Sequence, residues 1–355
     1  MEVQAEQQSR ENVASLSYRA LALQVTCNAV NQLTSRDEVR KSMMETINRL
    51  SKQIRASINF IGKDTRLVVL PEYFLTGFPM GDTIEDWRGK ACIEMDGAEY
   101  DALGNVAQEN NIFLSGNTYE LDPHFPEIYF QTSFLINPAG EVILRYRRLN
   151  SMFAPTPHDV WDKYLEIYGI EGVFPVAETE IGNISLVASE EILYPEIARA
   201  FAVRGAEILL HSSSEVASPK LTHKHIARLA RSIENMCYVI SSNSAGIVNT
   251  DIPIASTDAG SAIIDYNGQI LVEAGSGESM VANAEIDVTA LRRHRRRPGM
   301  GNYLSRQRFE LYTPTYCENI FYPANSLKEK KATRNHFIQT QLDVITKLVE
   351  QGVIR

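Results

Sequence analysis

The chain has 355 residues, of which 44% are apolar and 22% charged, enough to bury the core of one large α/β domain or of two domains at most. Its net charge of -9 excludes a global positive field that would attract nucleic acid or an anionic membrane. We therefore expect a small molecule or another protein as partner, with no nucleic acid and no membrane. The first twenty residues lack the apolar stretch of a secretion signal, and no apolar run approaches membrane-spanning length.

The four cysteines are far apart and contain no CxxC pair, so the sequence indicates neither a zinc site nor a disulfide framework. They are Cys27, Cys92, Cys237 and Cys317. We expect them to be buried thiols in a reducing compartment, which predicts a cytoplasmic protein.

In chain order, periodicity predicts short strands that alternate with amphipathic helices. The first half contains expected strands at 20–26, 67–70 and 112–120, expected helices at 36–57 and 100–110, and a hairpin at 132–149. The second half contains strands at 184–188, 206–211 and 237–246, helices at 195–204 and 222–235, and a hairpin at 261–275 that turns at Asn267 and Gly268. This order favours mixed sheets covered by helices on their outer faces.

From about Arg292 the chain becomes basic and rich in turn residues, and residues 326–350 resemble a polar, weakly amphipathic helix. We predict a polar N-terminal segment (1–19), one α/β domain (20–295) and a C-terminal extension (296–355) that makes oligomer contacts. In an acidic chain without a nucleic-acid motif, the arginine run 292–297 is interpreted as a subunit-contact or anion-facing stretch.

Three segments place polar residues directly after apolar strands, where a sheet delivers side chains into a crevice. Glu72 follows LVVLP, and burial of a carboxylate there suits a general base, although a capping or ion-paired glutamate fits the segment equally well. Arg147 and Arg148 end a hairpin strand and must point to opposite sides, so one could face a pocket, or both could be solvated. Ser189 lies between a strand and a helix, as a nucleophile or as a simple helix cap.

The three segments together, in this order, resemble the glutamate, lysine and cysteine motifs of the nitrilase superfamily, the carbon-nitrogen hydrolases. The likeness covers about residues 21–288 and rests on LPEYFLTG, on RYRRL and on ASEEILYPEIARAFAVRGAEILL. It implies a four-layer αββα sandwich and a homodimer or higher homo-oligomer.

Carried over by the resemblance, Glu72 matches the general base, Arg148 the catalytic lysine and Ser189 the nucleophilic cysteine. Two of the three depart from the family pattern. A serine is expected here either from an engineered replacement of cysteine or from natural divergence, and Arg148 favours divergence, because such a replacement would leave the lysine in place. For a further acid of the family, Asp162 is the first choice, with Asp159 and Glu166 as alternatives.

We expect Tyr73, Glu190 and Ser213 to line the same pocket. His223 and His225 flank Lys224 at a helix start without the partners of a metal site, so they are expected at a surface or an interface.

The resulting hypothesis is hydrolysis of a small carboxamide without metal or organic cofactor, in which Glu72 accepts the proton of Ser189 and Arg148 stabilises the oxyanion. Arginine holds charge but does not give up a proton. Two alternatives remain. One is an inactive, ligand-binding pseudoenzyme, and the other is hydration or elimination that depends on Glu72 and forms no covalent intermediate.

Overall fold

The computed structural model describes residues 15–218 and 220–355 and contains two large sheets that face each other. The first sheet has the order β15 (Asn283–Asp287), β1 (Ser17–Ala22), β3 (Thr65–Val69), β5 (Phe113–Leu121), β6 (Phe130–Ile136) and β7 (Val142–Arg147), with β4 (Ile93–Glu94) beside β5. The second has the order β14 (Ile270–Glu273), β13 (Ala262–Ile264), β11 (Tyr238–Ser242), β10 (Ile208–Ser212), β9 (Gly182–Ala188) and β8 (Ala177–Thr179). A small third sheet pairs β2 (Cys27–Asn28) with β12 (Ile247–Val248).

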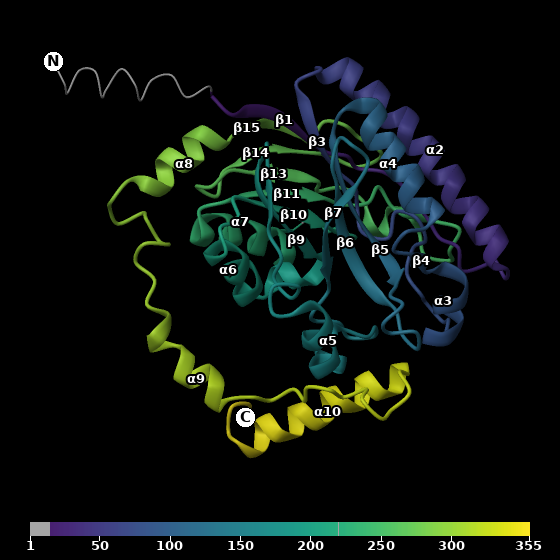
Figure 1. Ribbon diagram of the computed structural model, residues 1–355, viewed down its shortest axis with the longest axis vertical. Helices are drawn as coiled ribbons and strands as arrows, with labels where there is room; N and C mark the ends of the chain where they lie inside the picture. The colour runs from purple at the N-terminus through teal and green to yellow at the C-terminus, as the bar shows by residue number, and fades with distance from the viewer. Residues whose placement is uncertain (1–14, 219) are drawn as a thin grey trace.

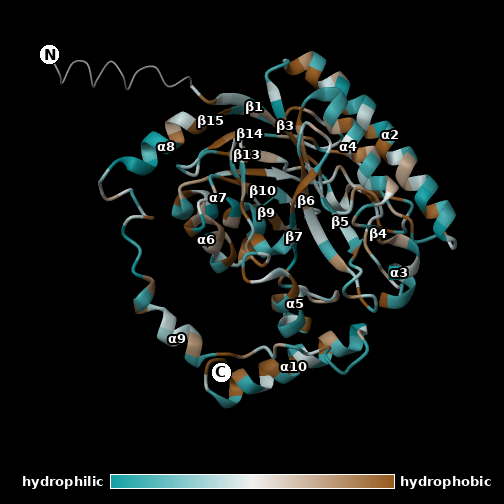
Figure 2. Cartoon of the chain, in the orientation of Figure 1, coloured by the Kyte–Doolittle hydropathy of each residue, from teal (hydrophilic) through white to brown (hydrophobic). Residues whose placement is uncertain are grey.

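Helices cover the outer face of each large sheet (Figure 1). The first sheet carries α2 (Arg36–Ile61), α3 (Ile84–Ala91) and α4 (Ala98–Asn110), and the second carries α6 (Pro195–Val203) and α7 (His223–Asn235). The expected αββα order of layers is therefore confirmed. Figure 2 shows apolar residues concentrated on the strands between these helical layers.

Strand alternation explains how one strand serves two cores. In β3, Leu67 and Val69 belong to the apolar cluster between the sheets, whereas Val68 belongs to the cluster under α2. Helix α2 begins after Ser35, whose side chain forms a capping box with Glu38. Its buried residues recur every three or four positions and include Val39, Met43, Ile47, Leu50 and Ile54.

The two sheets are joined at the edge where their parallel strands end. Oγ of Ser212, at the end of β10, donates to the carbonyl of Leu70 at 2.8 Å. Oγ of Ser242, at the end of β11, donates to the carbonyl of Leu23, also at 2.8 Å. The backbone N–H of Glu72 donates to the carbonyl of Ser213 at 3.3 Å. We call this set of contacts the seam; it fixes the carboxyl ends of β3, β10 and β11 against one another.

Several predicted boundaries differ from the observed ones. Strand β1 begins at Ser17, and residues 1–14 of the expected N-terminal segment lie outside the described residues. The stretch expected to be turn-rich from about residue 292 begins as part of α8 (Val288–Arg296), which is capped by the side chain of Asp287, and it has the expected turns only from residue 297 on. The arginines of α8 attach it to the core, because Arg292 pairs with Glu207 at 2.6 Å and Arg295 donates to backbone carbonyls.

The C-terminal extension runs along the outside of the sandwich (Figure 1). It contains α9 (Thr313–Glu318) and α10 (Arg334–Glu350), and the latter begins eight residues later than predicted because Thr333, not an earlier residue, caps it. Cys317 is exposed in this extension, so the expectation of four buried thiols is wrong for it, while the other three are buried. In the described part of the chain, no helix has both the length and the apolar character needed to cross a bilayer.

The remaining short helices connect these layers. They are α5 (Trp161–Tyr168) and the 3-10 turns η1 (Pro157–Val160), η2 (Ser189–Leu193), η3 (Ile254–Thr257) and η4 (Phe309–Leu311). Of these, η2 matters most for function because Ser189 is its first residue.

A close approach between α4 and the β6–β7 turn yields a first prediction. A Cβ at Gly104 would lie 2.5 Å from the carbonyl oxygen of Gly140, so Gly104→Ala is expected to lower the free energy of unfolding by about 1–3 kcal/mol. A Cβ at Gly89, in α3, meets nothing within 4 Å, so Gly89→Ala is the matched control and should be neutral or stabilising. Urea unfolding of both variants measures the difference, and equal stabilities would contradict the proposed contact.

Candidate active site

Glu72 lies just beyond β3, with its side chain buried between the two sheets at 1% exposure. Its Oε1 accepts a hydrogen bond from Nε2 of Gln131 at 2.6 Å and lies 3.7 Å from Nη1 of Arg148. Its Oε2 is buried and has no hydrogen-bond partner among the described residues. One carboxylate oxygen is therefore fixed by the protein, and the other is available to a reacting group.

Arg148 follows the end of β7 and is also buried. Its Nη1 donates to Oε1 of Gln131 at 2.8 Å, its Nε donates to the carbonyl of Asn150 at 2.7 Å, and its Nη2 pairs with Glu190. Burial by itself lowers the pKa of Arg148, but the neighbouring Tyr73, Glu72 and Glu190 outweigh it and raise the pKa above its ordinary value. Arg148 is thus a permanent cation that shares Gln131 with Glu72.

The preceding arginine points elsewhere, as strand alternation requires. Arg147 pairs with Asp122 at 2.6 Å and stacks over the ring of Tyr168, on the other side of β7. It therefore has a structural environment separate from that of Arg148.

Ser189 begins η2 directly after β9 and has a φ of 50°, in the left-handed region that non-glycine residues rarely adopt. His211 stabilises this turn, because its Nε2 donates to the carbonyl of Ser189 at 2.8 Å. Burial, followed by the charge of Arg228, lowers the pKa of His211 well below its ordinary value. Backbone strain at Ser189 is typical of a serine presented at a strand-to-helix turn.

Glu191 holds the arginine-bearing segment in place. Its Oε1 accepts from the backbone N–H groups of Leu149 and Asn150 at 2.7 Å and 2.9 Å, and its Oε2 accepts from the hydroxyl of Tyr146 at 2.8 Å. Burial raises the pKa of Glu191 to about 7, despite the opposing effects of Arg148 and of these hydrogen bonds.

Lys224 completes the cluster, and it was not among the predicted site residues. It lies in the first turn of α7, and its Nζ donates to Oγ of Ser189 at 3.0 Å and to Oγ of Ser213 at 3.5 Å. Burial lowers the pKa of Lys224, although the carboxylates of Glu72 and Glu215 act in the opposite direction.

The predicted residues fall into two groups. Glu72, Arg148 and Ser189 lie in one cluster at the seam, and the expected pocket residues adjoin it: Tyr73 follows Glu72, Glu190 pairs with Arg148, and Ser213 contacts Lys224. Asp162 does not join them. It is 67% exposed and lies 3.8 Å from Lys328 of the extension, because the buried side of α5 carries Tyr164, and positions two apart point to opposite sides of a helix.

Nor do the alternatives to Asp162 reach the cluster. Asp159 is buried, but its Oδ2 accepts from Thr156 and its Oδ1 from Ser326, so it caps η1 and fastens the extension. Glu166 lies on α5 and lines a cavity of about 840 Å³, which Asp162 and Lys328 also line.

The sequence did contain a pattern that places Lys224 on the inward face of its helix. The buried face of α7 includes Ala227, Arg228 and Arg231, three, four and seven positions beyond Lys224. That spacing places Lys224 on the inward face. Gln131 and His211 carried no comparable signal, since each lies within an apolar strand.

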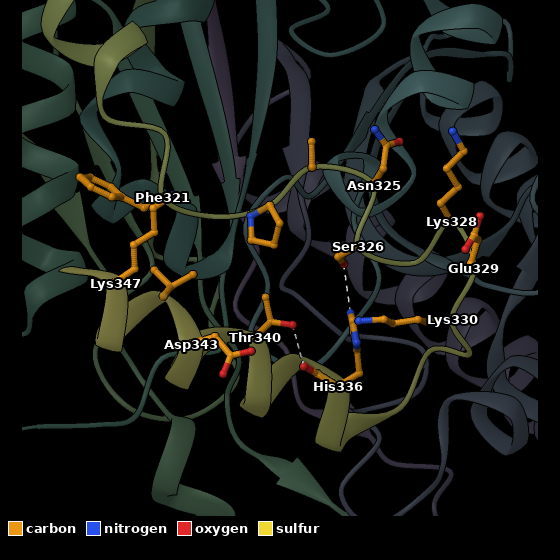
Figure 3. A pocket seen from close by; sticks show the side chains of 13 residues that line it. Phe321, Asn325, Ser326, Lys328, Glu329, Lys330, His336, Thr340, Asp343 and Lys347 are labelled. Atoms are coloured by element: carbon orange, nitrogen blue, oxygen red, sulfur yellow. Dashed lines mark hydrogen bonds between the residues drawn. The ribbon is translucent and has the colours of Figure 1, made fainter. Parts of the chain in front are cut away.

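A further cavity, of about 550 Å³, lies within the C-terminal extension, between residues 321–330 and α10 (Figure 3). Its lining includes Ser326, which hydrogen-bonds His336 at 3.0 Å, and Thr340. None of its lining residues comes from the segments that carry Glu72, Arg148 or Ser189. We therefore place the candidate site at the seam, where these three side chains lie, and not in this cavity. In the described part of the chain, no three His, Cys, Asp or Glu side chains are grouped so as to hold a metal ion.

Comparison with known proteins supplies an independent finding. Residues 27–296 match the profile of a family described as carbon-nitrogen hydrolase. Omega-amidase NIT3 of Saccharomyces cerevisiae is 25% identical over 251 residues, which cover 70% of this chain and 83% of the relative. The 2-oxoglutaramate amidase of Bacillus subtilis is 28% identical over 243 residues, covering 67% of this chain and 85% of the relative.

Solved structures agree on the fold. The crystal structure of S. cerevisiae Nit3, described as a member of branch 10 of the nitrilase superfamily, aligns with a TM-score of 0.62. The alignment covers 79% of this chain and 93% of that one, at 21% identity. A carbon-nitrogen hydrolase from Helicobacter pylori G27 gives a TM-score of 0.61 at 18% identity, covering 85% and 98%.

The environment of Glu191 predicts a pH dependence of stability. Because folding raises the pKa of Glu191 from 4.5 to about 7, the folded chain binds this proton more tightly, and the free energy of unfolding falls as pH rises through that window. Glu191→Gln removes the titration while its amide still faces Tyr146 and both N–H donors. The stability of the natural chain relative to the variant should fall by roughly 2–3 kcal/mol between about pH 5 and about pH 8. Urea unfolding at each pH tests this, and a difference independent of pH would contradict it.

Proposed function

The chain belongs to the carbon-nitrogen hydrolase family, and from this premise we propose that it hydrolyses the carbon-nitrogen bond of a small carboxamide, with Ser189 as the nucleophile. Both curated relatives described above are named as amidases. The observation that carries the proposal is the position of Ser189, which lies on a strained turn within a buried cluster containing Glu72, Arg148 and Lys224. Such a cluster matches the needs of acyl transfer better than those of a structural core.

In the proposed reaction, Oγ of Ser189 attacks the carbonyl carbon, and the positive charge of Arg148 stabilises the negative charge that develops on the carbonyl oxygen. The carbon-nitrogen bond then breaks, the proton given up by Oγ is transferred to the departing nitrogen, ammonia or an amine leaves, and an ester on Ser189 remains. Water attacks this ester, and the free Oε2 of Glu72 accepts a proton from the water. Because a guanidinium does not release its proton, Arg148 contributes charge and not proton transfer.

Ammonia release from a panel of small carboxamides tests this proposal, with intact-mass analysis of the protein during turnover. The natural chain should release ammonia and carry an acyl group on Ser189, while Ser189→Ala should do neither. Ser189→Cys should react faster in the acylation step, because a thiol loses its proton more readily than an alkanol.

The same measurements separate the two alternatives. Saturable binding of amides without turnover, in the natural chain and in Ser189→Cys alike, would instead support a pseudoenzyme. Turnover that survives in Ser189→Ala but stops in Glu72→Gln would support hydration or elimination without a covalent intermediate.

We also propose that the chain forms a homodimer or a larger homo-oligomer through α10. One side of this helix packs inward through Phe337 and Thr340. The other carries an exposed apolar stripe at helical spacing, formed by Ile338 (41% exposed), Leu342 (51%), Ile345 (41%) and Val349 (51%). A second copy of the chain is the occupant we assign to this stripe, because its symmetric self-contact would bury both stripes at once.

Sedimentation velocity at micromolar concentration should show at least twice the 39.9 kDa monomer mass. Leu342→Glu places a charge in the stripe and should shift the protein toward monomer, whereas Gln339→Glu adds the same charge outside the stripe and should not. A monomeric natural chain, or equal behaviour of the two variants, would contradict the α10 interface.

A further inference from the structure

The cluster at the seam contains two basic side chains, and they differ in what they can do. Arg148 has hydrogen bonds or ion pairs from all three guanidinium nitrogens, to Asn150, Gln131 and Glu190. Lys224 instead points its single side-chain nitrogen, Nζ, at Oγ of Ser189, 3.0 Å away. Among the hydrogen bonds of the described residues, this is the one that reaches Oγ of Ser189.

Local structure places Lys224 at this position. Thr222 caps α7 by accepting from the backbone N–H of His225, so that the helix begins immediately before Lys224. Further along α7, Arg228 fastens the inward face through Glu215 at 2.8 Å and through the carbonyl of Gly260 at 2.7 Å. Lys224 therefore extends toward Ser189 from a helix that is capped at its N-terminus by Thr222 and fixed along its inward face by Arg228.

The charges around Lys224 come from each segment that meets at the seam. They are Glu72 after β3, Arg148 after β7, Glu190 in η2, Glu215 after β10, and Arg228 on α7 itself. Burial is the dominant influence and favours the neutral amine, so the pKa of Lys224 is lower than that of an ordinary lysine. A lysine nitrogen in hydrogen-bond contact with a serine hydroxyl is positioned to act as its general base once that nitrogen has lost its proton.

Glu72 is less well placed for this task. Its Oε1 is occupied by Gln131 and lies near Arg148, and this fixed carboxylate has no hydrogen bond to Ser189 among the described residues. Its free Oε2 remains suited to the hydrolytic water, as proposed above.

We propose that Lys224 is the general base that activates Ser189, so that the site works as a serine-lysine pair in which the proton-transferring lysine comes from α7 rather than from the end of β7. This inference rests on the proposed amide hydrolysis. A catalytic lysine can both stabilise charge and transfer a proton. In this proposal Arg148 supplies the positive charge, and Lys224 transfers the proton.

Protons balance over the two halves of the proposed reaction. As Oγ of Ser189 forms a bond to the carbonyl carbon, its proton moves to the neutral Nζ of Lys224, and the carbonyl electron pair moves to oxygen. When the carbon-nitrogen bond breaks, the Lys224 ammonium returns that proton to the departing nitrogen, which leaves as ammonia or an amine. In the second half, water supplies the hydroxyl of the acid product, and the water proton, first accepted by Glu72, is delivered to Oγ of Ser189 as the ester bond breaks, which restores the Ser189 hydroxyl.

Two measurements test the pair in the intact chain: amide hydrolysis, and the rate at which a fluorophosphonate probe labels Ser189. Lys224→Met should lower both kcat/KM and the labelling rate by about 10²–10⁴-fold, the usual contribution of a general base. Lys220→Met is the matched control, because Lys220 is an exposed lysine on the preceding loop, and it should change neither rate. Circular dichroism and urea unfolding show whether each variant remains folded.

The pH profile separates a base from a fixed cation. If Lys224 is the base, the labelling rate of the natural chain should rise with pH as the amine loses its proton, with a midpoint below the ordinary lysine value of about 10.4. Lys224→Met should lack this rise. Lys224→Arg retains the charge without a basic nitrogen, so it should remain as slow as Lys224→Met. Substantial activity in Lys224→Arg, or an unchanged rate in folded Lys224→Met, would overturn the assignment.

Failure of the pair and failure of the amidase function give different results. If amide hydrolysis does not depend on Lys224, the proposed role of Lys224 is wrong and the amidase function stands. If labelling of Ser189 depends on Lys224 but no amide is hydrolysed, the Ser189–Lys224 pair stands and the amidase function is wrong. Absence of both reactions in the folded natural chain would overturn both.

Discussion

The hydrogen-bonded seam between the two sheets is the constraint on which the rest of the site depends. Ser212 and Ser242 donate across it to backbone carbonyls of the first sheet, and Glu72 donates back to Ser213. These contacts are buried, and an unpaired buried polar group is costly, so the sheets cannot slide without losing them. Because the seam joins strand ends, Glu72, just beyond β3 of the first sheet, and Ser189, just beyond β9 of the second, enter the same cluster of side chains.

Most strands and helices could be predicted from periodicity and turn residues, as in α2 and the β6–β7 hairpin, whereas the four-layer order was implied by the family resemblance. The approximate positions of Glu72, Arg148 and Ser189 followed from polar residues at strand ends and from the family resemblance. What could not be predicted depends on tertiary contacts. Helix α8 forms in a basic stretch because its arginines find Glu207 and backbone carbonyls, which no local pattern reveals.

Asp162 and Lys224 show that predictions for the site, too, were limited by tertiary contacts that the sequence does not reveal. Asp162 was chosen by its place along the chain, but the orientation of α5 turns it toward the extension. Lys224 was not among the predicted site residues, but the cap at Thr222 and the inward face of α7 bring it to Ser189. Under our proposal, Arg148 supplies the fixed charge at the position that resembles the family lysine, and Lys224, whose Nζ contacts Oγ of Ser189, supplies the proton transfer.

The protonation state of Lys224 is the most direct test of this account. Heteronuclear NMR of chain labelled at the lysine side-chain nitrogens, with the Lys224 signal assigned by its loss in Lys224→Met, would follow the amine through a pH titration. The account predicts that Lys224 titrates clearly below the ordinary lysine value of about 10.4, because burial disfavours its charged form. A Lys224 signal that remains that of an ammonium up to or beyond that value would contradict it.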